Sequence, residues 1–587
     1  MKLRISIITL LLMLITACTT PPAQDNTLEP APKTKPAAEK TPPPTADKKV
    51  EKQPAPAVSP ELSGELLYYL LSAEIAGQRG RLDVAVPFYL KAAQLSRDPD
   101  IAERATRVAV YARDEKSALA AAQLWVELQP NNLEAHQVSA ALLMREGKVD
   151  EALPHLEQVL SADPKNGHNS YLLITSLLSK EKDKQAALEA MEKLLATRRH
   201  DPEALYAYAH LAMLVGSQDK AEAAINEVIE LIPNWSEAHI LRANILIRQG
   251  QSEQVLSLLQ ETLEDYPDDI AIRLFYARRL VDERRYEQAR EQFSILLDYK
   301  PDAPEALFAM GLLNLQTQRP GEALRNFERL VELGQRVDEA HYYLGQAAEM
   351  RGDTEAAMQY YSEVRKGNNY IDAQIRIAAM LAEQGDLDAA RAHVQNISAP
   401  TLDMELRLFL AEGEILRNAN KYQEAYDVYS LALLQMPDNP QLLYARALTA
   451  EKMGRVDEAV ADLELIVKNE PNNAEALNAL GYTLVDLTHR IAEGQQYIEK
   501  ALKLKPDDPA ILDSMGWAYY RLGQHKKALQ YLQRAFDKLK DPEIAAHLGE
   551  VLWVLGEKDQ ARQIWDEALR ETPKDKVLLN VIERFLQ

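Results

Sequence analysis

The sequence predicts an all-α solenoid of about fifteen helical hairpins, and two observations support this prediction. Leu, Ala, Glu, Gln and Arg dominate the composition, which favours helix along the chain. Small residues also recur every 33 to 35 residues, with Val255 and Gly494 filling two positions of a register otherwise held by alanine at Ala85, Ala118, Ala152, Ala186, Ala221, Ala289, Ala323, Ala357, Ala390, Ala425, Ala459, Ala528 and Ala561. So long a register indicates stacked repeats, which need no separate globular cores even over 587 residues.

The first element is an export signal. Lys2 and Arg4 precede the apolar residues 5–15, a stretch too short to span a bilayer, which takes about twenty residues as a helix. Residues 15–18 read Ile-Thr-Ala-Cys, which resembles a bacterial lipobox, and Cys18 is the only cysteine. The resemblance implies cleavage before Cys18 and acylation of that residue. We therefore expect a lipoprotein signal peptide at 1–17, although an ordinary signal peptide beside a chance cysteine is the alternative.

A proline-rich tether is expected next, over residues 18–60. Residues 19–60 hold eleven of the thirty prolines, and such a segment cannot bury enough apolar area to fold. Several acyl chains on Cys18 would anchor it firmly and make the only membrane contact. Thr19 stands where aspartate, in the lipoprotein pattern, often retains proteins at the inner membrane. The resemblance therefore implies the outer membrane, with the chain facing the periplasm.

The repeats are expected to fill residues 61–573. Each first helix carries a small residue, such as Gly413, where its partner helix crosses closely, and the second helix opens with the register alanine. Four residues later comes a large side chain, such as Tyr429, and a proline such as Pro437 often closes the unit, because it cannot continue a helix. Residues 574–587 carry apolar residues at helical spacing and are expected to cap the end of the stack.

This pattern resembles the tetratricopeptide repeat, with Ala561, Trp565, Ala568 and Pro573 at the matching positions of one unit. The resemblance implies a right-handed superhelical solenoid whose first helices line a binding groove. Three stretches depart from the pattern. Residues 167–200 lack the closing proline, residues 488–494 contain an insertion, and residues 392–404 are irregular. We expect bends or local opening there.

Candidate binding residues are those at the repeat positions that face the groove. Tyrosine and tryptophan suit such a surface, because they supply large contact area at little cost in rotamer entropy. The alternative is that several of these rings pack between adjacent repeats. The lysine and asparagine clamp with which some relatives hold a carboxylate terminus is missing. The candidates are Tyr342, Tyr444, Asn478, Tyr482, Asp513, Trp517, Tyr520 and Arg521.

Charge and motifs argue against other classes of function. The net charge of -22 disfavours a nucleic-acid partner, because phosphate contacts need clustered lysine and arginine. The eleven histidines include no pair at i, i+4, and no phosphate loop or nucleophile elbow occurs, so we expect no metal and no cofactor beyond the lipid on Cys18. An enzyme would need a non-repeat block of a few hundred residues. The sequence therefore predicts a protein-binding function without catalysis.

Two stretches, residues 68–130 and 477–522, resemble more than generic repeats. They carry YYLLSAEIAGQRG and AAQLWVELQP in the first, and LNALGYTLVD and PAILDSMGWAYYRLG in the second. Both resemble a proteobacterial family of outer-membrane tetratricopeptide lipoproteins, one branch of which, in pseudomonads, binds a periplasmic carboxyl-terminal processing protease. The resemblance implies a scaffold that presents substrates, such as peptidoglycan cross-link hydrolases, to that protease. An assembly factor for outer-membrane or envelope machinery and an activator of a peptidoglycan synthase are the alternatives. The oligomeric state is left open.

Overall fold

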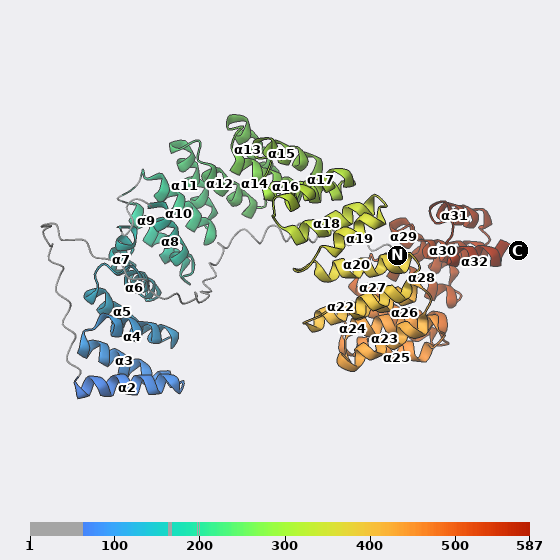
Figure 1. Cartoon of the computed structure of the whole chain (residues 1–587), viewed down its shortest axis with the longest axis horizontal. Coiled ribbons are helices and arrows are strands. Elements are labelled where there is room, and N and C mark those ends of the chain that lie inside the picture. The colour runs from blue at the N-terminus through green and yellow to red at the C-terminus, as the bar shows by residue number, and fades with distance from the viewer. Residues whose placement is uncertain (1–62, 162–166, 197, 199, 587) are drawn as a thin grey trace, which may run out of the picture. The chain divides into compact units, whose positions relative to one another are not determined.

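The computed structural model describes residues 63–161, 167–196, 198 and 200–586, and this part of the chain is built from helices and turns without a strand (Figure 1). The expected signal peptide, Cys18 and the whole of the expected tether lie outside the described residues. The chain divides into two compact units, one ending at Ala306 and the other beginning at Leu307. Within the described ranges, no helix is both long enough and apolar enough to cross a membrane.

The helices of the first unit alternate between first and second members of a hairpin, beginning with the pair α2 and α3. Their bounds are α2 (Gly64–Gln78), α3 (Leu82–Ser96), α4 (Pro99–Tyr111), α5 (Glu115–Leu128), α6 (Leu133–Arg145), α7 (Val149–Ser161), α8 (Gly167–Ser179), α9 (Lys184–Leu195), α10 (Pro202–Leu214), α11 (Gln218–Leu231), α12 (Ser236–Arg248), α13 (Ser252–Asp265), α14 (Ile270–Asp282) and α15 (Tyr286–Tyr299).

The second unit continues the same alternation from α16, the helix that contains the unit boundary. Its helices are α16 (Pro304–Gln316), α17 (Pro320–Glu332), α18 (Val337–Met350), α19 (Thr354–Ser362), α20 (Tyr370–Glu383), α21 (Leu387–Gln395), α22 (Leu402–Asn418), α23 (Tyr422–Gln435), α24 (Pro440–Lys452), α25 (Val456–Asn469), α26 (Ala474–Leu487), α27 (Ile491–Leu504), α28 (Pro509–Arg521), α29 (His525–Lys538), α30 (Pro542–Leu555), α31 (Lys558–Glu571) and α32 (Lys576–Leu586).

Paired in chain order, α2 to α31 make fifteen hairpins in the described part of the chain, so the predicted fold class and repeat number are confirmed. The first helices often begin at an acidic or amide cap. Asp508, for example, accepts hydrogen bonds from the backbone amides of Ala510 at 3.0 Å and Ile511 at 3.2 Å. Pro509 then takes the first helical position, where its missing amide costs nothing. The turn between units is therefore encoded locally.

The backbone carbonyl of the proline that closes a unit has no partner within a helix. In the first unit, side chains supply a hydrogen-bond partner for this carbonyl. His239 contacts the carbonyl of Pro233 at 2.7 Å through Nε2, and His136 contacts that of Pro130 at 2.9 Å. A further unit uses Arg273, whose guanidinium donates to Pro267 at 2.5 Å. Satisfying these acceptors matters, because an unpaired polar group in a closed site costs about 1–3 kcal/mol.

Packing inside a hairpin depends on two facing positions, one on each helix, whose volumes compensate each other. Gly345 faces Tyr361 so closely that a methyl group on Gly345 would lie 2.5 Å from the ring. At the same two positions of the hairpin α8–α9, the chain carries Ile174 and Ala190, and both are fully buried. The large member can therefore sit on either helix, provided that its partner is small.

The C-terminal end of the stack is covered by α32, which packs on α30. Leu578 is fully buried, and the Phe585 ring stacks on Trp565 with centroids 6.1 Å apart. This is the position expected for a capping helix. At the irregular stretch 392–404, α21 ends at Gln395 after only nine residues, whereas α22 extends to seventeen.

Candidate protein-binding surface

The first helices α26, α28 and α30 pack in sequence against one another in the second unit. Their facing side chains form a connected set of hydrogen bonds, ion pairs and ring contacts, which we call the His547 network. It comprises Tyr482, Asp486, Asp513, Trp517, Tyr520, Arg521, Glu543, His547 and Glu550. Five of the eight residues predicted from the sequence lie in this network.

His547 lies at the centre of the network. Its Nδ1 is 3.0 Å from each carboxylate oxygen of Asp513, and its ring stacks on Trp517 with centroids 4.1 Å apart. The two members of the ion pair are each 6% exposed, and Trp517 is 9% exposed. The indole that the sequence singled out is therefore largely enclosed, and it supports the surface from beneath.

The pKa of His547 reflects two opposing effects. Burial acts to lower the pKa, but the carboxylates of Asp513, Glu543 and Asp486 act in the opposite direction and outweigh it, so the pKa is raised. A raised pKa extends the range of pH over which the imidazolium form persists. The charged form of this buried imidazole is thus favoured by carboxylates from α26, α28 and its own helix, α30.

Asp486 joins α26 to α28. Its carboxylate accepts a hydrogen bond from the indole Nε1–H of Trp517 at 2.9 Å and pairs with Arg521 at the same distance. The Arg521 guanidinium also donates to the backbone carbonyl of Asp486 at 2.9 Å. These contacts fix the orientation of the Trp517 and Arg521 side chains, because the charged carboxylate of Asp486 accepts a hydrogen bond from each of them.

Tyr520 and Glu550 continue the network towards the C-terminal cap. The Tyr520 hydroxyl donates to Glu550 at 2.9 Å, and Arg584 of α32 pairs with the other oxygen of the same carboxylate. Burial, with the hydrogen bond to Glu550, raises the pKa of Tyr520 to about 12. Tyr520 therefore keeps its proton at neutral pH and presents a half-buried ring edge.

The other three predicted residues lie elsewhere. Tyr342 is 7% exposed and packs between Tyr343 and Tyr361, with centroid distances of 5.2 Å and 5.7 Å. Tyr444 is half-buried against the core of α24 and its neighbours. Asn478 has a buried Oδ1 that accepts no hydrogen bond within the part of the chain described.

Sequence reasoning missed His547, Glu543 and Glu550 as candidates. Glu543 and Glu550 occupy groove-facing positions of α30, so the same register could have found them. His547 lies outside those positions, and its role follows only from its contact with α28. Across the described residues, no three His, Cys, Asp or Glu side chains are grouped so as to hold a metal ion.

Comparisons with known proteins agree with this architecture. Tetratricopeptide-repeat family models match residues 138–195, 178–245, 246–313, 309–371, 373–396 and 406–574. A TPR repeat-containing protein of Pseudomonas aeruginosa is 37% identical over 513 residues, which cover 86% of this chain and 86% of that protein.

Two further similarities are weaker. The cellulose synthase operon protein C of Pseudomonas fluorescens is 24% identical over 407 residues, which are 58% of this chain and 32% of that protein. A solved tetratricopeptide repeat protein from Parabacteroides merdae has 20% identity and a TM-score of 0.29, and the match covers 42% of this chain and 98% of that one.

Proposed function

We propose that this chain, which belongs to the tetratricopeptide repeat family, is a periplasmic scaffold that binds a carboxyl-terminal processing protease and presents protein substrates to it. The observation that carries the proposal is the succession of fifteen helical hairpins in the described residues, which offers surfaces for proteins. The relation to a repeat protein over most of both chains supports protein binding in general. The protease follows from the resemblance of residues 68–130 and 477–522 to the lipoprotein family.

Two surfaces, one in each unit, support a role in joining two partners. In the first unit, α2 exposes an apolar face in which Tyr68 is 59% exposed, Leu71 52% and Ile75 49%. Large exposed apolar faces of this kind mark interaction sites. In the second unit, the His547 network offers half-buried aromatic rings and fixed charges. The two surfaces differ in chemistry, which suits two different partners.

The mechanism is an increase in effective concentration. A protease and a substrate held on one chain meet in an almost intramolecular reaction, which can raise apparent affinity by roughly 10²–10⁴ without a new contact between them. No catalytic group on the scaffold is needed. An acyl anchor on Cys18, with a tether over residues 18–60, would keep both partners at the outer membrane.

The proposal is tested by affinity capture with the full chain from a periplasmic extract, followed by mass spectrometry and by assays with purified protease. We expect the processing protease to be recovered and its substrate turnover to increase when the full chain is added. Recovery of a secretin, an outer-membrane insertion barrel or a peptidoglycan synthase in place of the protease would contradict the proposal. Those outcomes correspond to the assembly and synthase-activation alternatives.

Replacing both Tyr520 and Arg521 by alanine is expected to weaken binding of one component, protease or substrate, at least about tenfold, because aromatic and arginine anchors dominate such interfaces. Replacing Leu71 and Ile75 of α2 by glutamate is expected to weaken the other component. Fluorescence anisotropy with each purified component measures both effects. Tyr531→Ala, on the second helix α29 of the same hairpin as Tyr520, is the control and should change neither affinity more than about twofold. If both double variants lost affinity for the same component, the proposal of two separate binding surfaces would be contradicted.

A further inference from the structure

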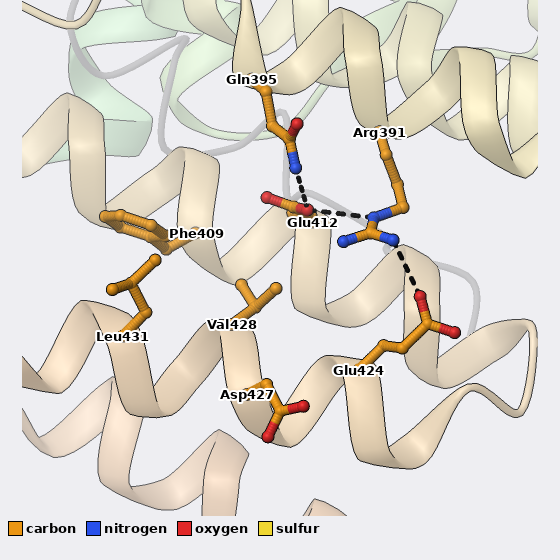
Figure 2. Close-up of a pocket in the computed structure, with 8 residues that line it drawn as sticks. All are labelled: Arg391, Gln395, Phe409, Glu412, Glu424, Asp427, Val428 and Leu431. Atoms are coloured by element: carbon orange, nitrogen blue, oxygen red, sulfur yellow. Dashed lines mark hydrogen bonds and ion pairs between the residues drawn. The ribbon is translucent and has the colours of Figure 1, made fainter.

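A small pocket opens among α21, α22 and α23, away from the His547 network. It has a volume of about 250 Å³ and is lined by Arg391, Gln395, Phe409, Glu412, Glu424, Asp427, Val428 and Leu431 (Figure 2). Pockets that bind drug-sized ligands usually measure roughly 300–1,000 Å³, so this one suits a single side chain.

The pocket coincides with the irregular hairpin. α21 has nine residues, whereas α23 has fourteen, so α21 ends at Gln395 before it covers the full length of its neighbours. The chain then reaches α22 only at Leu402. The missing turns of helix leave Phe409 of α22 and Val428 of α23 at the surface of the pocket, each only half-buried.

One side of the pocket is polar and firmly held. Glu412 is only 5% exposed, and its Oε1 accepts hydrogen bonds from Gln395 at 2.7 Å and from Arg391 at 3.2 Å. Arg391 also pairs with Glu424 at 2.8 Å. Figure 2 shows these bonds as a chain from Gln395 through Glu412 and Arg391 to Glu424. The polar wall is therefore preformed and loses little freedom on binding.

The charge of the pocket is unbalanced. Three carboxylates, of Glu412, Glu424 and Asp427, face one guanidinium, that of Arg391. Asp427 is exposed and accepts one hydrogen bond, from Gln423 at 2.8 Å, and it joins no ion pair in the described part of the chain. A positively charged group bound in the pocket would thus meet the Asp427 carboxylate, which can accept further hydrogen bonds.

The opposite side is apolar. Phe409 and Leu431 lie together on one side of the pocket in Figure 2, with Val428 between them and the charged groups. Leu431 is 55% exposed, and Leu434, one turn further along α23, is 80% exposed. An exposed apolar strip beside a concave acidic site differs from an ordinary solvated helix face, on which charged residues would cover such positions.

We propose that this pocket binds an arginine or lysine side chain from an apolar segment of a protein partner, an inference that rests on the proposed scaffold function. The aliphatic stem of that side chain lies against Val428 and Leu431, and its cationic end meets Asp427 and Glu424. Long basic side chains combine such a stem with a charged end. Apolar residues of the same segment cover Leu434. The net negative charge of the pocket selects a basic residue over a neutral one of similar length.

The test uses the full chain and two fluorescein-labelled peptides that differ at one position. Both are alanine-based and carry leucines on either side of a central residue, which is arginine in one peptide and norleucine in the other. Fluorescence anisotropy is expected to show at least about tenfold tighter binding of the arginine peptide. Equal affinities, or no binding of the arginine peptide up to about 1 mM, would overturn the proposal.

Asp427→Lys is expected to remove the preference for arginine, and Leu431→Glu to weaken both peptides. The matched control is Asp566→Lys on α31, which makes the same charge change at another exposed carboxylate of the second unit. An equal loss of preference in Asp427→Lys and Asp566→Lys would overturn the assignment to the pocket, because it would reflect net charge alone. The peptide assay does not involve the protease. Affinity capture can therefore contradict the proposed scaffold function while the pocket still prefers the arginine peptide. Capture can equally recover the protease while the pocket shows no preference.

Discussion

Replacing Gly549 by alanine is expected to destabilise the C-terminal hairpin α30–α31 by about 1–3 kcal/mol, the usual cost of overpacking a core. A methyl group at this position would overlap the Trp565 indole, which is 1% exposed. The indole cannot move away from the added methyl group, because the rings of Trp553 and Phe585 stack against it, at centroid distances of 5.7 Å and 6.1 Å. The helix preference for alanine over glycine is overcome by this contact.

The volume compensation between the two facing positions sharpens this expectation. Other hairpins carry alanine on the first helix opposite an aliphatic residue, as with Ala447 and Leu463, and both are fully buried. Trp565→Leu should therefore relieve the overlap created by Gly549→Ala. We expect the double variant to be more stable than the sum of the two single effects predicts, with a coupling of about 0.5–3 kcal/mol.

Urea unfolding followed by circular dichroism measures the three variants, and hydrogen exchange across α30, α31 and α32 locates the change, because repeat stacks can open locally. Gly321→Ala is the matched control, since Gly321 lies in helix α17 with open space around its Cα. That change should be neutral or stabilising, by at most about 1 kcal/mol. Strict additivity of the single variants would contradict the proposed pairing of Gly549 with Trp565.

The repeat architecture was predictable from the sequence because its determinants are local and periodic. The register alanines are almost all fully buried, and Trp565, Tyr429 and Phe327 each fill the position four residues later, as expected. The helix α32 was also predictable, because its apolar residues recur at helical spacing. Each of these features needs only a hairpin and its immediate neighbour.

The details of the binding surface were less predictable, because they depend on contacts between side chains about thirty residues apart. The register placed Trp517 on the groove side but left open whether the ring binds or packs. Its hydrogen bond to Asp486 and its stacking on His547 enclose it. The pocket beside α21 depends on where that helix ends, and helix ends are the least certain feature of a sequence-based prediction.

Asp513→Asn is expected to destabilise the second unit by roughly 3 kcal/mol at pH 6, because it removes the hydrogen-bonded counter-charge of a buried imidazolium. The charged pair is enclosed by Trp517 and Tyr482, with ring centroids at 4.1 Å and 6.3 Å from that of His547. Little water can reach the imidazolium to replace the carboxylate. Asp513→Leu combined with His547→Leu removes both charges and should cost less than the two single changes added together.

The effect of Asp513→Asn should depend on pH in a defined direction. Because the pKa of His547 is raised in the folded chain, its contribution to stability is fully present below the unfolded value of about 6.5 and is lost as pH rises through the folded value. The difference in unfolding free energy between the native chain and Asp513→Asn should therefore shrink above that point. Urea titrations between about pH 5.5 and 9.5 measure this difference and cancel the background from the other acidic groups. A difference that stays constant over this range would mean that His547 is neutral throughout, and that Asp513 holds it by an ordinary hydrogen bond.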